Sequence, residues 1–205
     1  MQIIILFFAI RKSAAKMKNI VLFASGGGSN AEQIMKYFNN GTEVKVVAVF
    51  TNNAAAGVLE KALKYDVPAI VFTRDDLNGG KVLEQVKELN PDLIVLAGFL
   101  WKFPSDIIAA YPDKVINIHP ALLPKYGGKG MYGINVHRAV LENGERESGI
   151  TIHYVNDNYD EGNIIFQERV LLDGCACAED VAAKVLELEH RHFPEVIEKL
   201  LKDDF

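Results

Sequence analysis

An amide and an imidazole occur two residues apart in the segment Asn117-Ile118-His119-Pro120. Side chains alternate along a strand, so Asn117 and His119 are expected to point to one side and Ile118 to the other. Because Pro120 cannot donate to a strand ladder, the pair is predicted at the carboxyl edge of a sheet. Such donors can stabilise an oxygen that becomes negatively charged during a reaction. A His and an Asn that satisfy only each other and nearby backbone are the structural alternative.

A glycine-rich turn, Ser25-Gly26-Gly27-Gly28-Ser29-Asn30, separates an apolar run from a helical pattern. Glycines let the backbone approach a ligand, and the free N–H groups of a helix start favour an anion, so a phosphate is the expected ligand. A tight turn in which Ser29 or Asn30 caps the helix explains the same residues without a ligand. A dinucleotide site is disfavoured, because the next apolar run lacks the acidic residue that binds a ribose.

Three acidic residues lie in the polar segment 156–162. A solvated turn is the ordinary interpretation, and a cation site is the alternative. The histidines and acids show no spacing typical of metal ligands, and His190 and His192, two apart on an expected helix, would not face one site. No metal site is predicted.

Apolar runs and helical patterns alternate from residue 19 onward, which predicts βαβ units and an open, mostly parallel twisted sheet with helices on both faces, a Rossmann-like α/β fold. Strands are expected at 20–24, 44–50, 69–72, 93–98 and 115–119, with helices at 30–38, 57–65, 81–89 and 105–110. The segment 73–80 is expected to be a loop. In such sheets ligands bind beyond the carboxyl ends of the strands.

The pattern changes after Pro120. A glycine-rich loop and a helix at 134–142 are followed by two alternating strands at 149–155 and 163–171, which we expect to form an antiparallel edge near the C-terminus. A helix at 179–201 is expected to end the fold, and Pro194 is expected to kink or split it.

The composition is ordinary for a globular protein: 205 residues, 49% hydrophobic and 24% charged, with two cysteines. Cys175 and Cys177 are too close together to staple a fold, which points to a reducing, cytoplasmic location. The net charge of -5 and the lack of a basic stripe argue against nucleic acid as a partner.

Residues 1–16 combine an apolar run with the cations Arg11, Lys12 and Lys16. The run is too short to span a bilayer, and its charges follow it instead of preceding it as in a secretory signal. We expect residues 1–16 to be an N-terminal extension of a single domain at 17–205, with a start at Met17 as the simplest explanation. A membrane anchor is the alternative, and no membrane partner is predicted.

The segment 117–124 (NIHPALLP), preceded by Leu96-Ala97-Gly98-Phe99 and followed by Asp157-x-x-Asp160-x-Gly162, strongly resembles the folate-dependent formyltransferases. The resemblance covers roughly residues 18–201. The glycine turn after the first strand is similar to the single-domain members that act on phosphoribosylglycinamide in purine synthesis. It implies 10-formyltetrahydrofolate as co-substrate, small-molecule partners only, and a monomer or homodimer.

In that family an amine attacks the formyl carbon, and the resemblance implies Asn117, His119 and Asp160 as the catalytic residues. Asn117 and a protonated His119 would donate to the tetrahedral oxygen. The Asp160 carboxylate is expected to favour the imidazolium form of His119. A water beside Asp160 and His119 would relay the proton that the amine loses and the folate nitrogen gains.

The resemblance also implies two sets of binding residues. Those for phosphoribosylglycinamide are Gly28, Ser29, Asn30, Ala31, Glu32 and Glu189. Those for the folate are Leu100, Trp101, Lys102, Phe103, Asn117 and Asp157, with Arg74 as a stand-in for a family Arg that this chain lacks. The loop 125–133 is longer and richer in glycine than in many members, so we expect it to move when ligand binds and to bring Lys125 or Lys129 toward an anion.

Three other functions fit part of this pattern. A formyltransferase for another amine, such as an initiator methionyl-tRNA or a nucleotide sugar, would use the same trio, but the tRNA enzyme needs a basic surface and a further domain. A formyltetrahydrofolate hydrolase would replace the amine with water, but that family carries an additional N-terminal domain. A non-catalytic folate or nucleotide binder on the same fold is the third.

Overall fold

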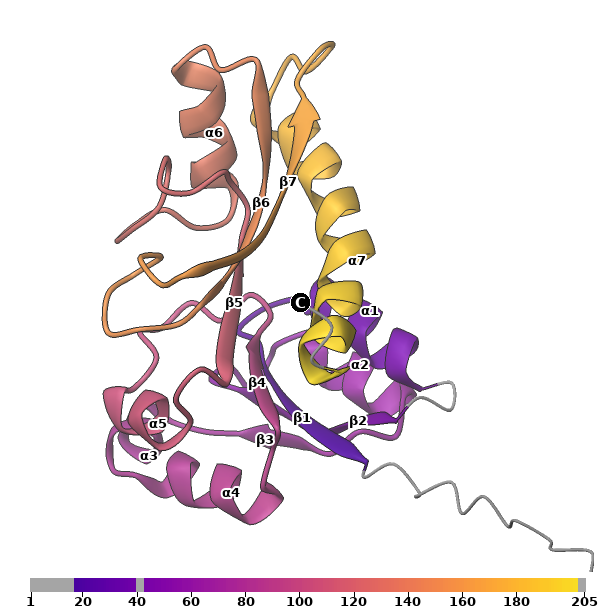
Figure 1. Ribbon diagram of the computed structural model, residues 1–205, viewed down its shortest axis with the longest axis vertical. Coiled ribbons are helices and arrows are strands. Elements are labelled where there is room, and N and C mark those ends of the chain that lie inside the picture. The colour runs from indigo at the N-terminus through magenta and orange to yellow at the C-terminus, as the bar shows by residue number, and fades with distance from the viewer. Residues whose placement is uncertain (1–16, 40–42, 203–205) are drawn as a thin grey trace, which may run out of the picture.

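The computed structural model describes residues 17–39 and 43–202, which form a seven-stranded sheet in the order β3-β2-β1-β4-β5-β6-β7 (Figure 1). The strands from β1 to β5 pair in parallel, and β6 and β7 are antiparallel to their neighbours, as the sequence predicts. The strands are β1 (Lys18–Phe23), β2 (Val44–Thr51), β3 (Ala69–Val71), β4 (Leu93–Leu96), β5 (Val115–His119), β6 (Glu147–Tyr154) and β7 (Ile164–Leu171).

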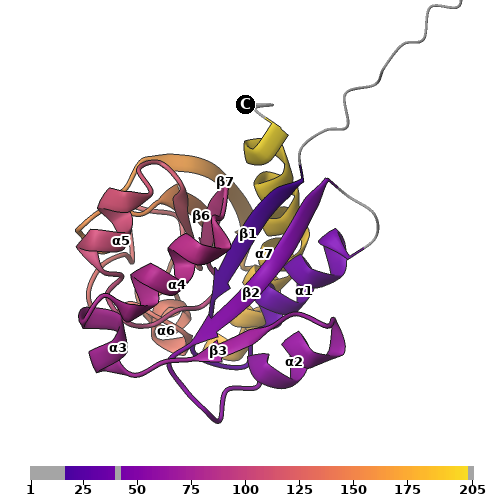
Figure 2. The ribbon, with the colours of Figure 1, turned by 90° about the horizontal axis from the view of Figure 1, so that it is seen from below.

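Helices cover both faces of the sheet, which confirms the predicted layers (Figure 2). They are α1 (Ser29–Phe38), α2 (Val58–Lys64), α3 (Arg74–Asn78), α4 (Lys81–Leu89), α5 (Ser105–Ala110), α6 (Ile134–Glu142) and α7 (Ala178–Lys202). Strand β1 shows why two cores form: Ile20 and Leu22 pack in one apolar cluster with α1 and α7, while Val21 and Phe23 pack in the other with α4 and α5. Alternate side chains of one strand therefore serve opposite faces.

The order in which strands are added to the sheet reverses between β1 and β4. The chain builds outward from β1 to β3 and then returns to place β4 on the other side of β1. Ser25, just after β1, joins the two carboxyl ends: its N–H donates to the Gly98 carbonyl over 3.0 Å, and its hydroxyl accepts from the Leu100 N–H over 3.0 Å. Such a switch point is where open α/β sheets bind ligands.

Two expectations about local structure differ from the fold. The segment after β3 is not all loop, because α3 begins behind a capping box: the Thr73 hydroxyl accepts from the Asp76 N–H, and the Asp76 carboxylate accepts from the Thr73 N–H.

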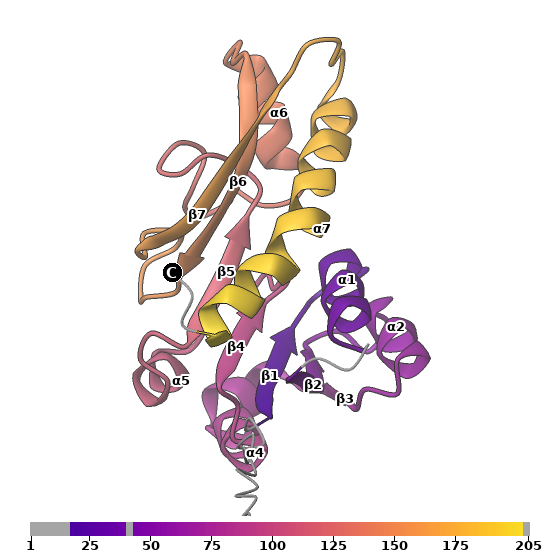
Figure 3. The ribbon, with the colours of Figure 1, turned by 45° about the vertical axis from the view of Figure 1, so that its right-hand side comes forward.

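Of the two expected effects of Pro194, the split is wrong, since α7 is continuous from Ala178 to Lys202 and lies along the sheet (Figure 3). Pro194 and its neighbour Phe193 are buried against the core. Tertiary packing of this apolar face therefore outweighs the missing backbone donor.

The predicted N-terminal extension, residues 1–16, lies outside the described residues. Across 17–39 and 43–202, no helix is long and apolar enough to cross a membrane.

Candidate active site

A cavity of about 430 Å³ opens at the carboxyl ends of β4 and β5. Its wall consists of the segments 98–103, 117–120, 128–133 and 155–160, together with Asn30, Leu96, His137, His153 and Glu189. The segment that carries Asn117 and His119 therefore meets the polar turn that carries Asp160. Because the cavity also lies at the switch point, the fold and the candidate chemistry coincide.

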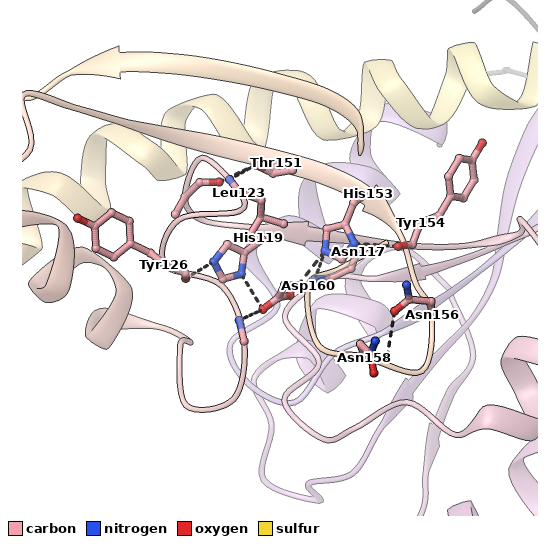
Figure 4. A network of polar contacts seen from close by, with 12 residues as sticks. Asn117, His119, Leu123, Tyr126, Thr151, His153, Tyr154, Asn156, Asn158 and Asp160 are labelled. Atoms are coloured by element: carbon pink, nitrogen blue, oxygen red, sulfur yellow. Dashed lines mark hydrogen bonds and ion pairs between the residues drawn. The ribbon is translucent and has the colours of Figure 1, made fainter. Parts of the chain in front are cut away.

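Asp160 is the centre of a polar network in this cavity (Figure 4). Its Oδ2 atom lies 3.5 Å from Nδ1 of His119 and accepts a hydrogen bond of 2.8 Å from the Gly128 N–H. The glycine-rich loop is thus tied to the acidic turn through Asp160. The structure brings together all three of the residues that the resemblance implies as catalytic.

His119 is almost fully buried, and its Nε2 lies 2.7 Å from the carbonyl oxygen of Tyr126. A carbonyl only accepts, so Nε2 carries a proton, and in the neutral ring Nδ1 is an unprotonated acceptor that faces Asp160. Burial lowers the pKa of His119 below its ordinary value of 6.5, although Asp160 and Tyr126 act in the opposite direction. Asp160 thus favours the imidazolium form of His119, as expected, but desolvation of the buried ring is the larger effect and the net shift is downward.

The pKa of the Asp160 carboxyl lies below its ordinary value of 3.8. Burial alone would raise this pKa, but the contact with His153, the charge of His119 and the hydrogen bond from Gly128 together lower it. Asp160 is consequently an anion at neutral pH and can stabilise positive charge on a neighbouring imidazole.

The sequence interpretation missed His153, which completes the network. In the β5–β6 pairing His153 lies directly opposite Asn117, and the Asn117 Nδ2 donates to His153 Nε2 over 3.2 Å. The second side-chain nitrogen of His153 lies 2.8 Å from the Tyr154 carbonyl oxygen. Alternation along the predicted strand places His153 and Thr151 on one face, but the sequence does not reveal which residue of β5 faces them.

Thr151 and Gln167 hold the backbone that follows His119. The buried Thr151 hydroxyl donates to the Ala121 carbonyl over 2.7 Å and accepts from the Leu123 N–H over 3.0 Å. The Gln167 amide donates to the Thr151 hydroxyl and to the Leu123 carbonyl, over 2.8 and 3.0 Å. These bonds hold the Ala121 carbonyl and both backbone groups of Leu123, which restrains the turn that follows His119.

His137, on α6, is a second residue that the sequence interpretation did not select. It is buried in the wall of the cavity, and its Nδ1 has no hydrogen-bond partner among the residues that the structure describes. Burial is the main reason why the pKa of His137 lies below 6.5, and the neighbouring His119 acts in the same direction.

The expected substrate-binding residues divide into two groups. Asn30 and Glu189 line the cavity, and the Asn30 Nδ2 donates to Glu189 Oε2 over 2.7 Å. Burial raises the pKa of Glu189 above 4.5, although the Asn30 hydrogen bond opposes this shift. The remaining four, Gly28, Ser29, Ala31 and Glu32, are not part of the cavity wall.

Glu32 and Gly28 have structural roles that the sequence interpretation did not separate from binding. The Glu32 carboxylate pairs with Lys61 and Lys64, each at 2.9 Å, and none of these three residues is part of the cavity wall. Gly28 has φ +67°, and a Cβ there would lie 2.5 Å from Cγ2 of Val58 at the start of α2. A glycine is needed at this position so that α1 can begin close to α2.

The expected folate-binding segment, 100–103, lies wholly in the cavity wall, as does Asp157. It rests on an aromatic cluster in which Trp101 contacts Phe72 and Phe99, with ring centroids 6.2 and 6.4 Å apart. Arg74 is not in the wall; its guanidinium lies 4.3 Å from the centroid of the Trp101 ring. Arg74 therefore supports the segment from outside through a cation–π contact.

The glycine-rich loop places its two lysines differently. Lys129 lines the cavity, whereas the Lys125 ammonium pairs with Glu145 at 2.8 Å outside it. Of the two, only Lys129 is in position to approach an anion in the cavity. Within 17–39 and 43–202, no group of three or more His, Cys, Asp or Glu side chains could hold a metal ion.

Comparison with known proteins agrees with this geometry. The sequence model of the formyl transferase family matches residues 18–197. Phosphoribosylglycinamide formyltransferase of Escherichia coli is 35% identical over 87% of this chain and 85% of its own length. The chloroplastic phosphoribosylglycinamide formyltransferase of Arabidopsis thaliana is 39% identical over 89% of this chain. The chain spans 65% of the length of that plant relative and 62% of the length of a second one, from Vigna unguiculata.

Solved structures are similar over nearly the whole chain. The phosphoribosylglycinamide formyltransferase from Anaplasma phagocytophilum superposes with a TM-score of 0.84 at 32% identity, covering 92% of this chain and 89% of that one. The enzyme of the same name from Brucella melitensis gives 0.81 at 36% identity, covering 90% and 96%. Sequence, fold and cavity agree, and the chain belongs to the formyl transferase family.

Proposed function

We propose that this protein transfers the formyl group of 10-formyltetrahydrofolate to the amino group of 5-phosphoribosylglycinamide, giving formylglycinamide ribonucleotide and tetrahydrofolate in purine biosynthesis. The observation that carries the proposal is the meeting of Asn117, His119 and Asp160 in one cavity. The names of the relatives supply the substrate, because those proteins are phosphoribosylglycinamide formyltransferases.

The reaction needs a donor for one oxygen and an acceptor for one proton. The amine nitrogen bonds to the formyl carbon, and the carbonyl electron pair moves to oxygen, where the Asn117 N–H stabilises the negative charge. In comparable sites, one donor of this type lowers the activation barrier by roughly 2.7–4 kcal/mol. The tetrahedral carbon then releases N10 of the folate, and the carbonyl is restored.

His119 is the group suited to move the proton. Its Nδ1 is the free acceptor of the neutral ring, so it takes the proton that the attacking amine loses. Asp160, 3.5 Å away, stabilises the imidazolium that forms. His119 then returns the proton to N10, directly or through a water that contacts His119 and Asp160, which leaves the proton count unchanged.

The cavity and the adjoining start of α1 suit the two substrates. We assign the phosphoribosyl group to the start of α1, next to the cavity, where in the described part of the chain no side chain caps the first N–H groups, and the glycinamide end to Asn30 and Glu189. We assign the pterin to the apolar segment 100–103, where an aromatic cluster and backbone groups offer a slot for a flat heterocycle. With these assignments, the formyl group of the folate and the amine of the second substrate meet beside Asn117.

The decisive experiment is a spectrophotometric assay that combines 10-formyltetrahydrofolate with phosphoribosylglycinamide, beside a control without the amine. We expect tetrahydrofolate to form only when the amine is present. Formate release without the amine would support a hydrolase instead, and lack of turnover in both reactions would support a non-catalytic binder. A cytoplasmic location and a monomeric or homodimeric state remain predictions, to be tested by fractionation and size-exclusion chromatography.

A further inference from the structure

His153 is buried in the polar network of the cavity but has no role among the three residues implied as catalytic. Only 2% of it is exposed, and three polar groups surround its ring: the Asn117 amide, the Tyr154 carbonyl and the Asp160 carboxylate. Its position opposite Asn117 is set by backbone pairing between β5 and β6. Strand pairing therefore sets the neighbours of the ring, and its hydrogen-bond partners indicate which nitrogen is the donor when the ring is neutral.

The Tyr154 carbonyl decides which ring nitrogen carries the proton. His153 Nδ1 lies 2.8 Å from that oxygen, and because a carbonyl oxygen only accepts, Nδ1 must be the donor. In the neutral ring Nε2 is then a bare acceptor. Its nearest polar neighbour is a donor, Asn117 Nδ2 at 3.2 Å, whereas Asp160 Oδ1 lies beyond hydrogen-bond distance from Nε2, at 3.6 Å.

This arrangement selects one of the two orientations of the Asn117 amide. Rotating the amide by half a turn would set its Oδ1 against the Nε2 lone pair, where two acceptors repel. With Nδ2 toward His153, one N–H is used in that hydrogen bond and the second N–H remains for a ligand in the cavity.

We propose that His153 is a positioning residue for formyl transfer, whose neutral Nδ1–H form orients the Asn117 carboxamide as a donor to the tetrahedral oxygen. The inference rests on the function proposed above. His153 does not touch the reacting atoms in this mechanism; it acts through Asn117.

Gly162 supports the same arrangement from the other side. A Cβ at Gly162 would overlap the Tyr154 carbonyl oxygen and lie 3.5 Å from His153 Nδ1. The Tyr154 N–H is itself fixed, since it donates to the Asn163 carbonyl over 2.9 Å. The glycine of the Asp157-x-x-Asp160-x-Gly162 motif thus makes room for the carbonyl that sets the His153 proton.

Two amide substitutions at His153 test the roles of its two ring nitrogens independently. The Gln side chain places its amide near the position of Nε2, so His153→Gln keeps an acceptor for Asn117 and gives up the bond to Tyr154. The Asn amide lies near the position of Nδ1, so His153→Asn keeps the donor to Tyr154 and removes the acceptor. We expect H153N to lower kcat by about 10- to 100-fold with the KM of both substrates nearly unchanged, and H153Q to lower it by less than about fivefold.

The reverse ranking, with H153N the more active variant, would show that His153 serves only to anchor the Tyr154 backbone and would overturn the inference. A double-mutant cycle adds a second criterion, measured by single-turnover kinetics. If His153 acts through Asn117, H153N changes the rate of the Asn117→Ala enzyme by less than about twofold. Full additivity of the two losses contradicts the proposal.

A spectroscopic measurement keeps the inference testable apart from the proposed function. Nitrogen-15 NMR of the wild-type protein without substrate should show His153 with a protonated Nδ1 and an unprotonated Nε2 near neutral pH. If the assay finds no formyl transfer but NMR shows this tautomer, the function fails while the orientation of Asn117 stands. A proton on Nε2 of the neutral ring refutes the positioning role whatever the assay gives.

Discussion

Nδ1 of His119 lies 3.5 Å from Oδ2 of Asp160, although the two residues come from a strand end and from a turn beyond the next strand. Burial lowers the pKa of the imidazole, which favours its neutral form at pH 7, and the carboxylate beside it is charged. The pair is thus arranged to stabilise a proton that arrives during the reaction, in a buried place where charge interactions are strong.

Replacing Asp160 by Asn tests this relationship. D160N keeps the size of the side chain but removes the charge that stabilises the imidazolium, so we expect kcat/KM for formyl transfer to fall by about 10²- to 10³-fold. The adjacent Glu161, which is exposed and bonds to the Asn158 amide, provides the matched control: E161Q should change the rate by less than about twofold. Equal effects of D160N and E161Q would contradict the role of Asp160.

The stability of the protein should fall as the pH decreases below 6.5. The pKa values of His119 and His137 are both lower in the native state than their ordinary value of 6.5. Below that pH the unfolded chain binds more protons, so the free energy of unfolding decreases until the native-state pKa values are passed.

Urea denaturation at pH 7.5, 6.5 and 5.5 measures this loss. In His119→Asn one of the responsible groups is absent, so the decrease between pH 7.5 and 5.5 should be smaller than in the wild type. A wild-type free energy of unfolding that stays constant or rises over this range would contradict the assignment of His119 as a buried neutral ring.

Glu189 should show the opposite pH dependence. Its pKa is raised by burial, so its contribution to stability is fully present below pH 4.5 and is lost as the pH rises through the native-state pKa. Glu189→Gln retains an acceptor for Asn30 without a charge, and at pH 7 it should be at least as stable as the wild type. If Glu189 contacts the substrate, the KM for phosphoribosylglycinamide should rise in the same variant.

Thermal unfolding and steady-state kinetics of E189Q measure the two effects separately. Asn30→Ala offers the comparison, because it removes the hydrogen bond and leaves the buried acid without its partner. N30A should therefore be less stable than E189Q at pH 7. The opposite order would show that the carboxylate itself stabilises the fold.

Gly28 should be intolerant of a side chain for reasons of packing. Gly28→Ala combines a left-handed backbone conformation with an overlap against Val58, and we expect it to destabilise the protein by roughly 1–3 kcal/mol. Gly26→Ala is the matched control in the same turn, because a Cβ there meets no atom within 4 Å among the residues described and its φ is not in the left-handed region. Equal midpoints in urea for G28A and G26A would contradict this account.

The order and type of most elements follow from local patterns. The apolar runs of β1, β4 and β5 and the periodic helices between them are visible in the sequence, since burial on both faces requires continuous apolar strands. Local sequence patterns did not predict helix α3 or the continuity of α7, which depend on a helix cap and on tertiary packing. Helix α3 depends on the Thr73–Asp76 capping box, and α7 continues through Pro194 because its apolar face is buried.

The sequence by itself determined the fold class, the family and the Asn117–His119 pair, because alternation in a strand and a long motif are local properties of the chain. Only the tertiary structure decided that His153 faces Asn117, that Glu32 points to lysines outside the cavity and that His119 is neutral. Strand register, side-chain direction and desolvation depend on residues far apart in the chain, and the distances and burial that set them exist only once the chain has folded.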